Sequence, residues 1–164
     1  MTDSVALRAI YALRTRLEAI DGTGAYNTSA GGQIYIARGK VDQSVLPCLI
    51  LVPGDETAAP TTGDGAPSGQ SQAMRMSFEV NVEGHVTAEQ SNTGEQLEYI
   101  KADIKRAVLL FDSPTLADGN FKIGPVGYLG STPSPRDDGS QTESVQCRFR
   151  VTYTEKFGDP NATK

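Results

Sequence analysis

The sequence has no tryptophan, a single histidine and only two cysteines among its 164 residues. There is no second histidine in the sequence, and no cysteine lies near His85, so a metal site at His85 is not expected. We expect His85 to lie on the surface. The chain also lacks a nucleophile elbow, a P-loop, a dinucleotide fingerprint and a Cys-x-x-Cys pair. These absences predict a protein without metal or cofactor that is not an enzyme, although a site assembled between subunits stays open.

Long hydrophobic runs and an excess of basic residues are missing too. No apolar run approaches the roughly 20 residues that cross a bilayer, and segment 1–21 carries charges throughout, unlike a signal peptide. We therefore expect a chain made in the cytosol without membrane contact. The net charge is −5 and the pI about 4.9. Direct nucleic-acid binding is not expected, because it needs a cationic surface that displaces counterions.

The two cysteines, Cys48 and Cys147, each lie in an apolar, strand-like run. Free cysteine is among the residue types most often buried, so the simplest interpretation is a pair of buried, reduced thiols. A disulfide between neighbouring strands is the alternative.

The length of 164 residues is typical of a single domain. Two segments of the chain have helical periodicity. The first segment can be capped by Thr2 or Asp3, and its apolar stripe consists of Val5, Ile10, Leu13, Leu17 and Ile20. The second is expected from Thr93 to Phe111, with Thr93 and Gln96 in a capping box. Its stripe consists of Leu97, Ile100, Ile104, Val108 and Phe111.

Five segments have the character of β-strands, and they run over Gln33–Arg38, Val45–Pro53, Met74–Val86, Phe121–Gly130 and Ser144–Phe157. Two of them alternate clearly, with Phe78 and Val80 on one side of the third and Phe149 and Val151 on one side of the fifth. The predicted fold class is α+β: a mostly antiparallel mixed sheet with two amphipathic helices on one face, in the order αββ-arm-βαββ.

One long segment between two strands, Asp55–Gln72, has no apolar residue larger than alanine and is rich in Gly, Pro, Thr and Ser. Most connections in compact domains have about 4–6 residues, so this length calls for a purpose. We expect one domain over 1–164 with a flexible arm at 55–72 and a loose C-terminal tail at 158–164. The paired carboxylates Asp137 and Asp138, before Gly139, indicate a turn more than a cation site.

The polar sides of the two alternating strands carry opposite charges. Glu79 and Glu83 lie on one strand, and Arg148 and Arg150 on the other. If the strands share a sheet, these side chains can pair across it. A solvated sheet face and a flat surface that meets another subunit are both open interpretations.

The order of these segments resembles a known class of proteins. The stretches that carry the resemblance are "LRAIYALRTRLEAIDGTGAY", "LPCLILVPGDE", "MRMSFEVNVEGHV", "GEQLEYIKADIKRAVL", "PSPRDDGS" and "VQCRFRVTYTEKFGDP". Together, from about Val5 to Phe157, they look like the tail terminator, or tail completion, proteins of long-tailed bacteriophages, the class that includes the lambda tail terminator.

This resemblance implies a structural virion protein, assembled in the host bacterial cytoplasm. The implied assembly is a homohexameric ring on the head-proximal end of the tail tube, which stops tube polymerisation and offers a docking surface to the head-neck complex. The implied partners are further copies of the chain, the major tail tube protein and a head-tail connector or neck protein, with DNA passing through the ring. The candidate assembly contacts are Asp55, Glu56, Asp64, Gln70, Arg75, Arg136, Asp137, Asp138, Arg148 and Arg150.

Two other readings of the sequence stay open. The nearest alternative is another phage neck component, such as a head-closure or connector protein. From a different class, a ferredoxin-like ligand-binding domain or a small enzyme would require a pocket with convergent polar groups.

Overall fold

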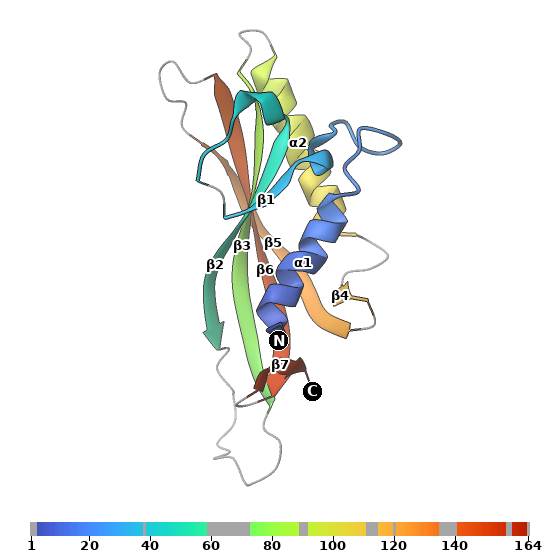
Figure 1. Cartoon of the computed structure of the whole chain (residues 1–164), viewed down its shortest axis with the longest axis vertical. Helices are drawn as coiled ribbons and strands as arrows, with labels where there is room; N and C mark the ends of the chain where they lie inside the picture. The colour runs from blue at the N-terminus through green and yellow to red at the C-terminus, as the bar shows by residue number, and fades with distance from the viewer. Residues whose placement is uncertain are drawn as a thin grey trace.

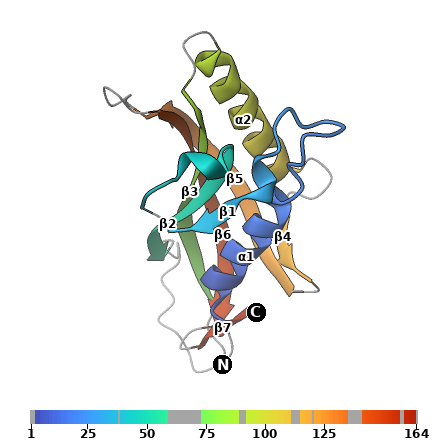
Figure 2. The ribbon, with the colours of Figure 1, turned by 45° about the horizontal axis from the view of Figure 1, so that its top comes forward.

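The computed structural model describes residues 3–37, 39–58, 73–88, 92–110, 115–119, 121–134, 141–156 and 159–163. Within these ranges, seven strands form one sheet, and both α-helices cover the same face of it (Figures 1 and 2). The strand order is β1-β2-β3-β6-β5-β4, and β7 pairs with β6. Only β1 and β2 run parallel; the other pairs are antiparallel. The predicted α+β class is confirmed.

The helices are α1 (Val5–Leu17) and α2 (Thr93–Val108), and the strands are β1 (Ile34–Ile36), β2 (Cys48–Ala58), β3 (Ala73–Thr87), β4 (Thr115–Asp118), β5 (Phe121–Pro133), β6 (Thr142–Lys156) and β7 (Asp159–Thr163). Short 3₁₀ turns at Ala30–Gly32 and Gln43–Val45 flank β1. Both helices and all five strand segments of the sequence analysis are present. β4 and β7 are additional, and β7 pairs with the end of β6 where the sequence suggested a loose tail.

Strand β2 continues past Pro53, where the sequence analysis ended it, and reaches Ala58. A β-bulge between Pro53 and Glu56 shifts the register with β3 by one residue, and the pairing then continues until Ala58, which lies opposite Met76. Residues 55–58 therefore belong to the sheet, and their assignment to the arm is wrong. Residues 59–72 lie outside the described residues, and the mobility of the arm stays a prediction.

The helix caps differ from those expected. Ser4 caps α1, because its side-chain Oγ accepts a hydrogen bond from the Leu7 N–H at 3.2 Å. Asn92 holds the cap position of α2, and Thr93 is already a buried residue of the helix. The capping box expected to start at Thr93 is therefore wrong, and the Asn92 side chain makes no capping hydrogen bond in its place.

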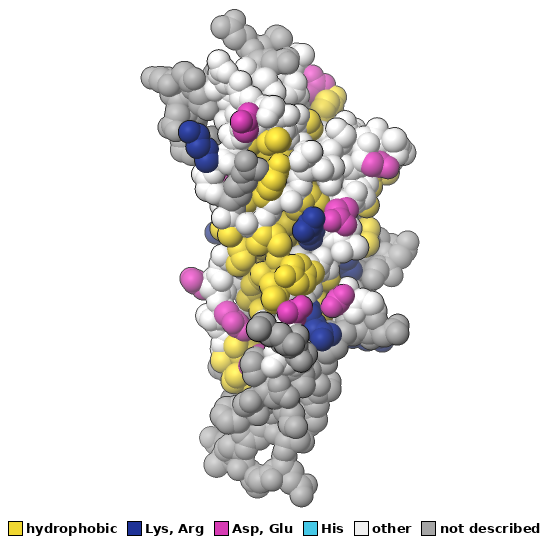
Figure 3. Space-filling model, in the orientation of Figure 1, with side chains coloured by type: hydrophobic (Ala, Val, Ile, Leu, Met, Phe, Trp, Pro, Cys, Tyr) yellow, Lys and Arg dark blue, Asp and Glu magenta, His cyan; other side chains and the backbone are white. Residues whose placement is uncertain are grey.

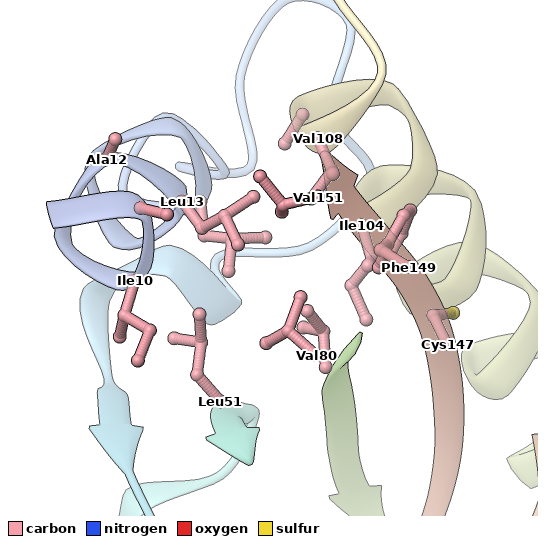
Figure 4. Packing of buried hydrophobic residues seen from close by; sticks show 14 of the residues in the cluster. Ile10, Ala12, Leu13, Leu51, Val80, Ile104, Val108, Cys147, Phe149 and Val151 are labelled. Carbon is pink, nitrogen blue, oxygen red and sulfur yellow. The ribbon is translucent and has the colours of Figure 1, made fainter. Parts of the chain in front are cut away.

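The core lies between the helices and the sheet, as the two stripes and the strand alternation predicted. Figure 4 shows Leu13 of α1 directed toward Val80 and Val151, and Ile104 of α2 beside Phe149. These five side chains are all 0% exposed, so the predicted parity of β3 and β6 is confirmed. Both cysteines are buried and free, as expected.

Helix α2 lies directly on β3 at Gly84. A Cβ atom placed on this residue would come within 2.9 Å of the Ile100 side chain, closer than real Cβ contacts. Glycine at this strand position therefore sets how near the helix approaches the sheet.

The Gly-rich loop after α1 is held by a buried carboxylate. Asp103 of α2 is 1% exposed and accepts hydrogen bonds from the backbone N–H groups and side chains of Asn27 and Thr28, at 2.7–3.0 Å. Arg16 of α1 donates to the carbonyl oxygens of Val108 and Thr115, at 2.7 and 2.8 Å. These contacts join α1, α2 and β4, so the helical layer does not depend on apolar packing alone.

Candidate assembly surfaces

The sheet face that points away from the helices is polar and charged along β3 and β6. Glu79 and Arg150 lie directly opposite one another, and the Arg150 Nη2 donates to the Glu79 Oε1 at 2.6 Å. The cross-strand pairing that the sequence suggested is therefore present. Both side chains are more than one third exposed, so the pair contributes at most about 1 kcal/mol to stability.

A second polar group lies further along the same face. Glu83 is in hydrogen-bond contact with the His85 Nε2 at 3.3 Å and accepts from the Gln146 Nε2 at 3.5 Å. The hydrogen bond with His85 is the main reason why the pKa of Glu83 is lowered. The His85 side chain is 15% exposed, so it is more covered than the surface histidine we expected. Across the described ranges, no group of three side chains could hold a metal ion.

Three of the candidate assembly contacts share this face: Arg75 on β3, and Arg148 and Arg150 on β6. Arg75 and Arg148 are exposed, and neither has an ion-pair partner among the described residues. Arg148 lies opposite Asn81 on one side and Gly130 on the other, so neither cross-strand neighbour offers it a carboxylate.

The remaining candidates divide into two sets. Asp55 and Glu56 are exposed near the end of β2. The others lie outside the described residues, and they are Asp64, Gln70, Arg136, Asp137 and Asp138.

On the helix side of the sheet, three ionisable side chains lie near one another toward the ends of β2 and β6. The Tyr153 hydroxyl donates to Glu56, and burial together with this bond raises the pKa of Tyr153. Glu155 is 9% exposed, and burial and the nearby Glu56 raise the pKa of its carboxyl. The sequence analysis did not single out Glu155. Its position on β6 has the same parity as Val151 and Tyr153, and this parity could have predicted that Glu155 is buried.

A shallow pocket of about 380 Å³ lies between the loop after α1, the start of β2, the end of β3 and α2. Among the described residues that line it, most contribute amide, hydroxyl or apolar groups, and Tyr99 is the one titratable side chain. The Tyr99 hydroxyl donates to Glu95 in the next turn of the helix. The pocket thus offers amide and hydroxyl groups for polar contacts.

Apolar side chains form a strip on the face seen in Figure 3, over the part of the molecule where Figure 1 shows α1 and β1. Tyr11 of α1 is 42% exposed and Ile36 of β1 is 36% exposed. Contiguous apolar surface of this kind marks a place of contact more often than an isolated apolar side chain does. No helix in the described part of the chain has the length and apolar character needed to cross a membrane.

No family model and no curated protein matches the chain. Among solved structures, a chain from one described as "Virion of native gene transfer agent (GTA) particle" is similar, with a TM-score of 0.53. The comparison covers 92% of this chain and 95% of that chain, at 13% sequence identity. At this identity the likeness shows a shared fold over nearly the whole length.

Proposed function

We propose that this chain is a structural virion protein, and more specifically a tail terminator of a long-tailed phage or phage-like particle. In this proposal it forms a homohexameric ring on the head-proximal end of the tail tube, stops tube polymerisation and carries the docking surface for the head-neck complex. The observation that carries the proposal is the fold, which is shared almost end to end with a chain of a virion particle.

The surfaces of the molecule support an assembly role more than a chemical one. An exposed apolar strip over α1 and β1 and an open, charged sheet face offer contact areas on two sides. The net charge of −5 suits a ring through which DNA slides, because like charge avoids phosphate binding. The partners in this proposal are further copies of the chain, the major tail tube protein and a connector or neck protein.

A head-closure or connector protein is the second candidate. The similar chain is described only by the whole virion from which it comes, so the shared fold is compatible with another position in the neck. Both candidates are non-enzymatic components of the particle.

Electron microscopy of particles assembled without this chain tests the proposal. A tail terminator predicts overlong tails without heads, because nothing stops tube growth. Tails of normal length that fail to join filled heads would favour the neck component instead. Normal infectious particles would contradict both roles, and restoring the wild-type chain in the same strain is the control.

A further inference from the structure

Most of the described arginine and lysine side chains already have a contact within the chain. Lys101 and Arg150 pair with carboxylates, and Arg16 donates to backbone carbonyl oxygens. Arg75 of β3 and Lys122 of β5 are different, because both are exposed and neither has an ion-pair or hydrogen-bond partner among the described residues. In a chain of net charge −5, two such cations close together indicate a place for an anionic group.

Both cations line one pocket of about 240 Å³. It lies near the start of β3 and the end of β6, at the lower end of the sheet in Figure 1. Arg75 is opposite Thr154 in the ladder between these strands, and Thr152 lies two residues away on the same face of β6. Lys122 comes from β5, so three neighbouring strands contribute polar side chains to one pocket.

Strand β5 forms a wall of this pocket and stays in contact with β6. The backbone of Gly124 lies against the Thr152 carbonyl oxygen, and an added Cβ atom would approach this oxygen to 1.8 Å. Glycine therefore allows the two backbones to come this close. Because no chain can enter between β5 and β6 at this point, a ligand reaches the pocket from the solvent side, where Arg75 and Lys122 are exposed.

The side chains that line this pocket are rich in hydrogen-bond donors. The planar guanidinium of Arg75 can donate two parallel hydrogen bonds to a carboxylate, and the ammonium of Lys122 adds a compact positive charge. The hydroxyls of Thr152 and Thr154 are half-buried, and neither is in a hydrogen bond with another described residue. The described lining contains no carboxylate, so the pocket fits an oxyanion supplied from outside.

The distribution of charge favours a carboxylate over the phosphates of DNA. Binding to DNA gains its affinity from several phosphates that are contacted at once. Arg148, another cation of this sheet face, lies six residues from Thr154 along β6, which is about 20 Å at the rise of a strand. Two cations in one pocket match a single carboxylate, whereas the net charge of −5 repels a long polyanion.

We propose that this pocket binds a carboxylate side chain of an acidic protein segment, which Arg75 and Lys122 hold together with the hydroxyls of Thr152 and Thr154. The contact should weaken as ionic strength rises, because exposed charges are screened over about 10 Å at 0.1 M salt. This site goes beyond the proposed function and does not depend on the ring. The tail-length experiment tests the terminator role separately.

The test is an NMR titration of the full chain with the peptide acetyl-Gly-Asp-Gly-amide, read at the backbone amides of Gly124, Thr152 and Thr154. Saturable shifts are expected at these three positions. The matched peptide acetyl-Gly-Asn-Gly-amide has nearly the same shape without the charge, and it should bind at least about tenfold more weakly.

Two variants connect the binding to the pocket. Arg75→Ala/Lys122→Ala should bind the acidic peptide at least about tenfold more weakly than the wild type, because both charges are lost. Both side chains are exposed, so the core keeps its contacts, and unchanged amide shifts far from the pocket verify the fold. Arg148→Ala removes a cation from the same sheet face outside the pocket, and it should bind as the wild type does.

The outcomes that would overturn the proposal are distinct. Equal binding of the two peptides, wild-type affinity in the double variant, or no saturable shift in the wild type would each contradict a carboxylate site. A short DNA duplex is the competing ligand. If it shifts the three amides at lower concentration than the acidic peptide does, the pocket is a phosphate site and the acidic segment is wrong.

Discussion

Two buried carboxylates at opposite ends of the molecule have very different surroundings. Asp103, on α2, is 1% exposed and accepts hydrogen bonds from the backbone and side chains of Asn27 and Thr28. Glu155, at the end of β6, is 9% exposed, and burial is the main reason why the pKa of its carboxyl is raised. Its electrostatic neighbour is Glu56, another carboxylate, and the two repel each other when both are charged.

The two ends of the molecule differ in how their carboxylates are accommodated. Around α2, Asp103 is held by four N–H and O–H donor groups beside the apolar core. At the lower end, two carboxylates, Glu56 and Glu155, lie near one another, and β2 extends past its pairing with β1. Two neighbouring carboxylates repel when both are charged, so the lower end is the less stable of the two.

The largest effect should come from the core under α2. Phe149→Ala removes a 0% exposed ring that packs against Tyr128 at 5.5 Å, and we expect the free energy of unfolding to fall by about 3–5 kcal/mol. Chemical denaturation measures it. The matched variant at the lower end is Tyr153→Phe, on the same face of the same strand, which should cost about 1 kcal/mol. A loss below about 1 kcal/mol for Phe149→Ala would break the comparison, since the core would then tolerate a cavity.

The next effect tests the satisfied carboxylate. Asp103→Ala leaves the backbone N–H groups of Asn27 and Thr28 without an acceptor, and we expect a loss of about 2–3 kcal/mol. Hydrogen exchange should show faster exchange at these two amides before the core opens. Asp118→Ala, at an exposed position of β4, is the control and should change neither quantity. Unchanged exchange at residues 27 and 28 would mean that the loop is held by other contacts.

The carboxylate beside Glu56 should respond in the opposite direction when its charge is removed. The pKa of Glu155 is raised in the folded state, so its contribution to stability is full below the unfolded pKa, about 4.3, and is lost as pH rises through the folded pKa. Glu155→Gln removes the charge and should raise the melting temperature of the isolated subunit by a few degrees at pH 7. The gain should vanish near pH 4, and a gain that is independent of pH would argue against burial of a charge.

The smallest effect is on thiol reactivity. Burial raises the pKa of the Cys147 thiol to about 11, and Cys48 is buried as well. Because the thiolate is the reactive form, both residues should resist alkylation at pH 8 in the native state and react fully in denaturant. Fast native labelling of Cys147 would show that α2 opens readily, which would contradict a stably packed core under this helix.

Much of the fold could be predicted from the sequence because its periodicity is local. The stripes of both helices, and the alternation that buries Val80 and Phe149, depend only on 3.6-residue and two-residue repeats. Pro47 lies just before β2, as its missing N–H requires. The charged pair of Glu79 and Arg150 could be anticipated as soon as the two strands were assumed to be neighbours.

Tertiary structure alone decided the features that distinguish the two ends. The pairing of the strands depends on contacts between distant segments, and no short repeat in the sequence encodes these contacts. The same contacts decide that Lys122 of β5 lines the same pocket as Arg75 of β3. The short β4 and β7 have no alternation strong enough to predict them. Asp103 and Glu155 are both acidic residues in the sequence. Only the folded chain brings the amides of residues 27 and 28 to Asp103 and brings a second carboxylate, Glu56, to Glu155, because both neighbours come from distant segments.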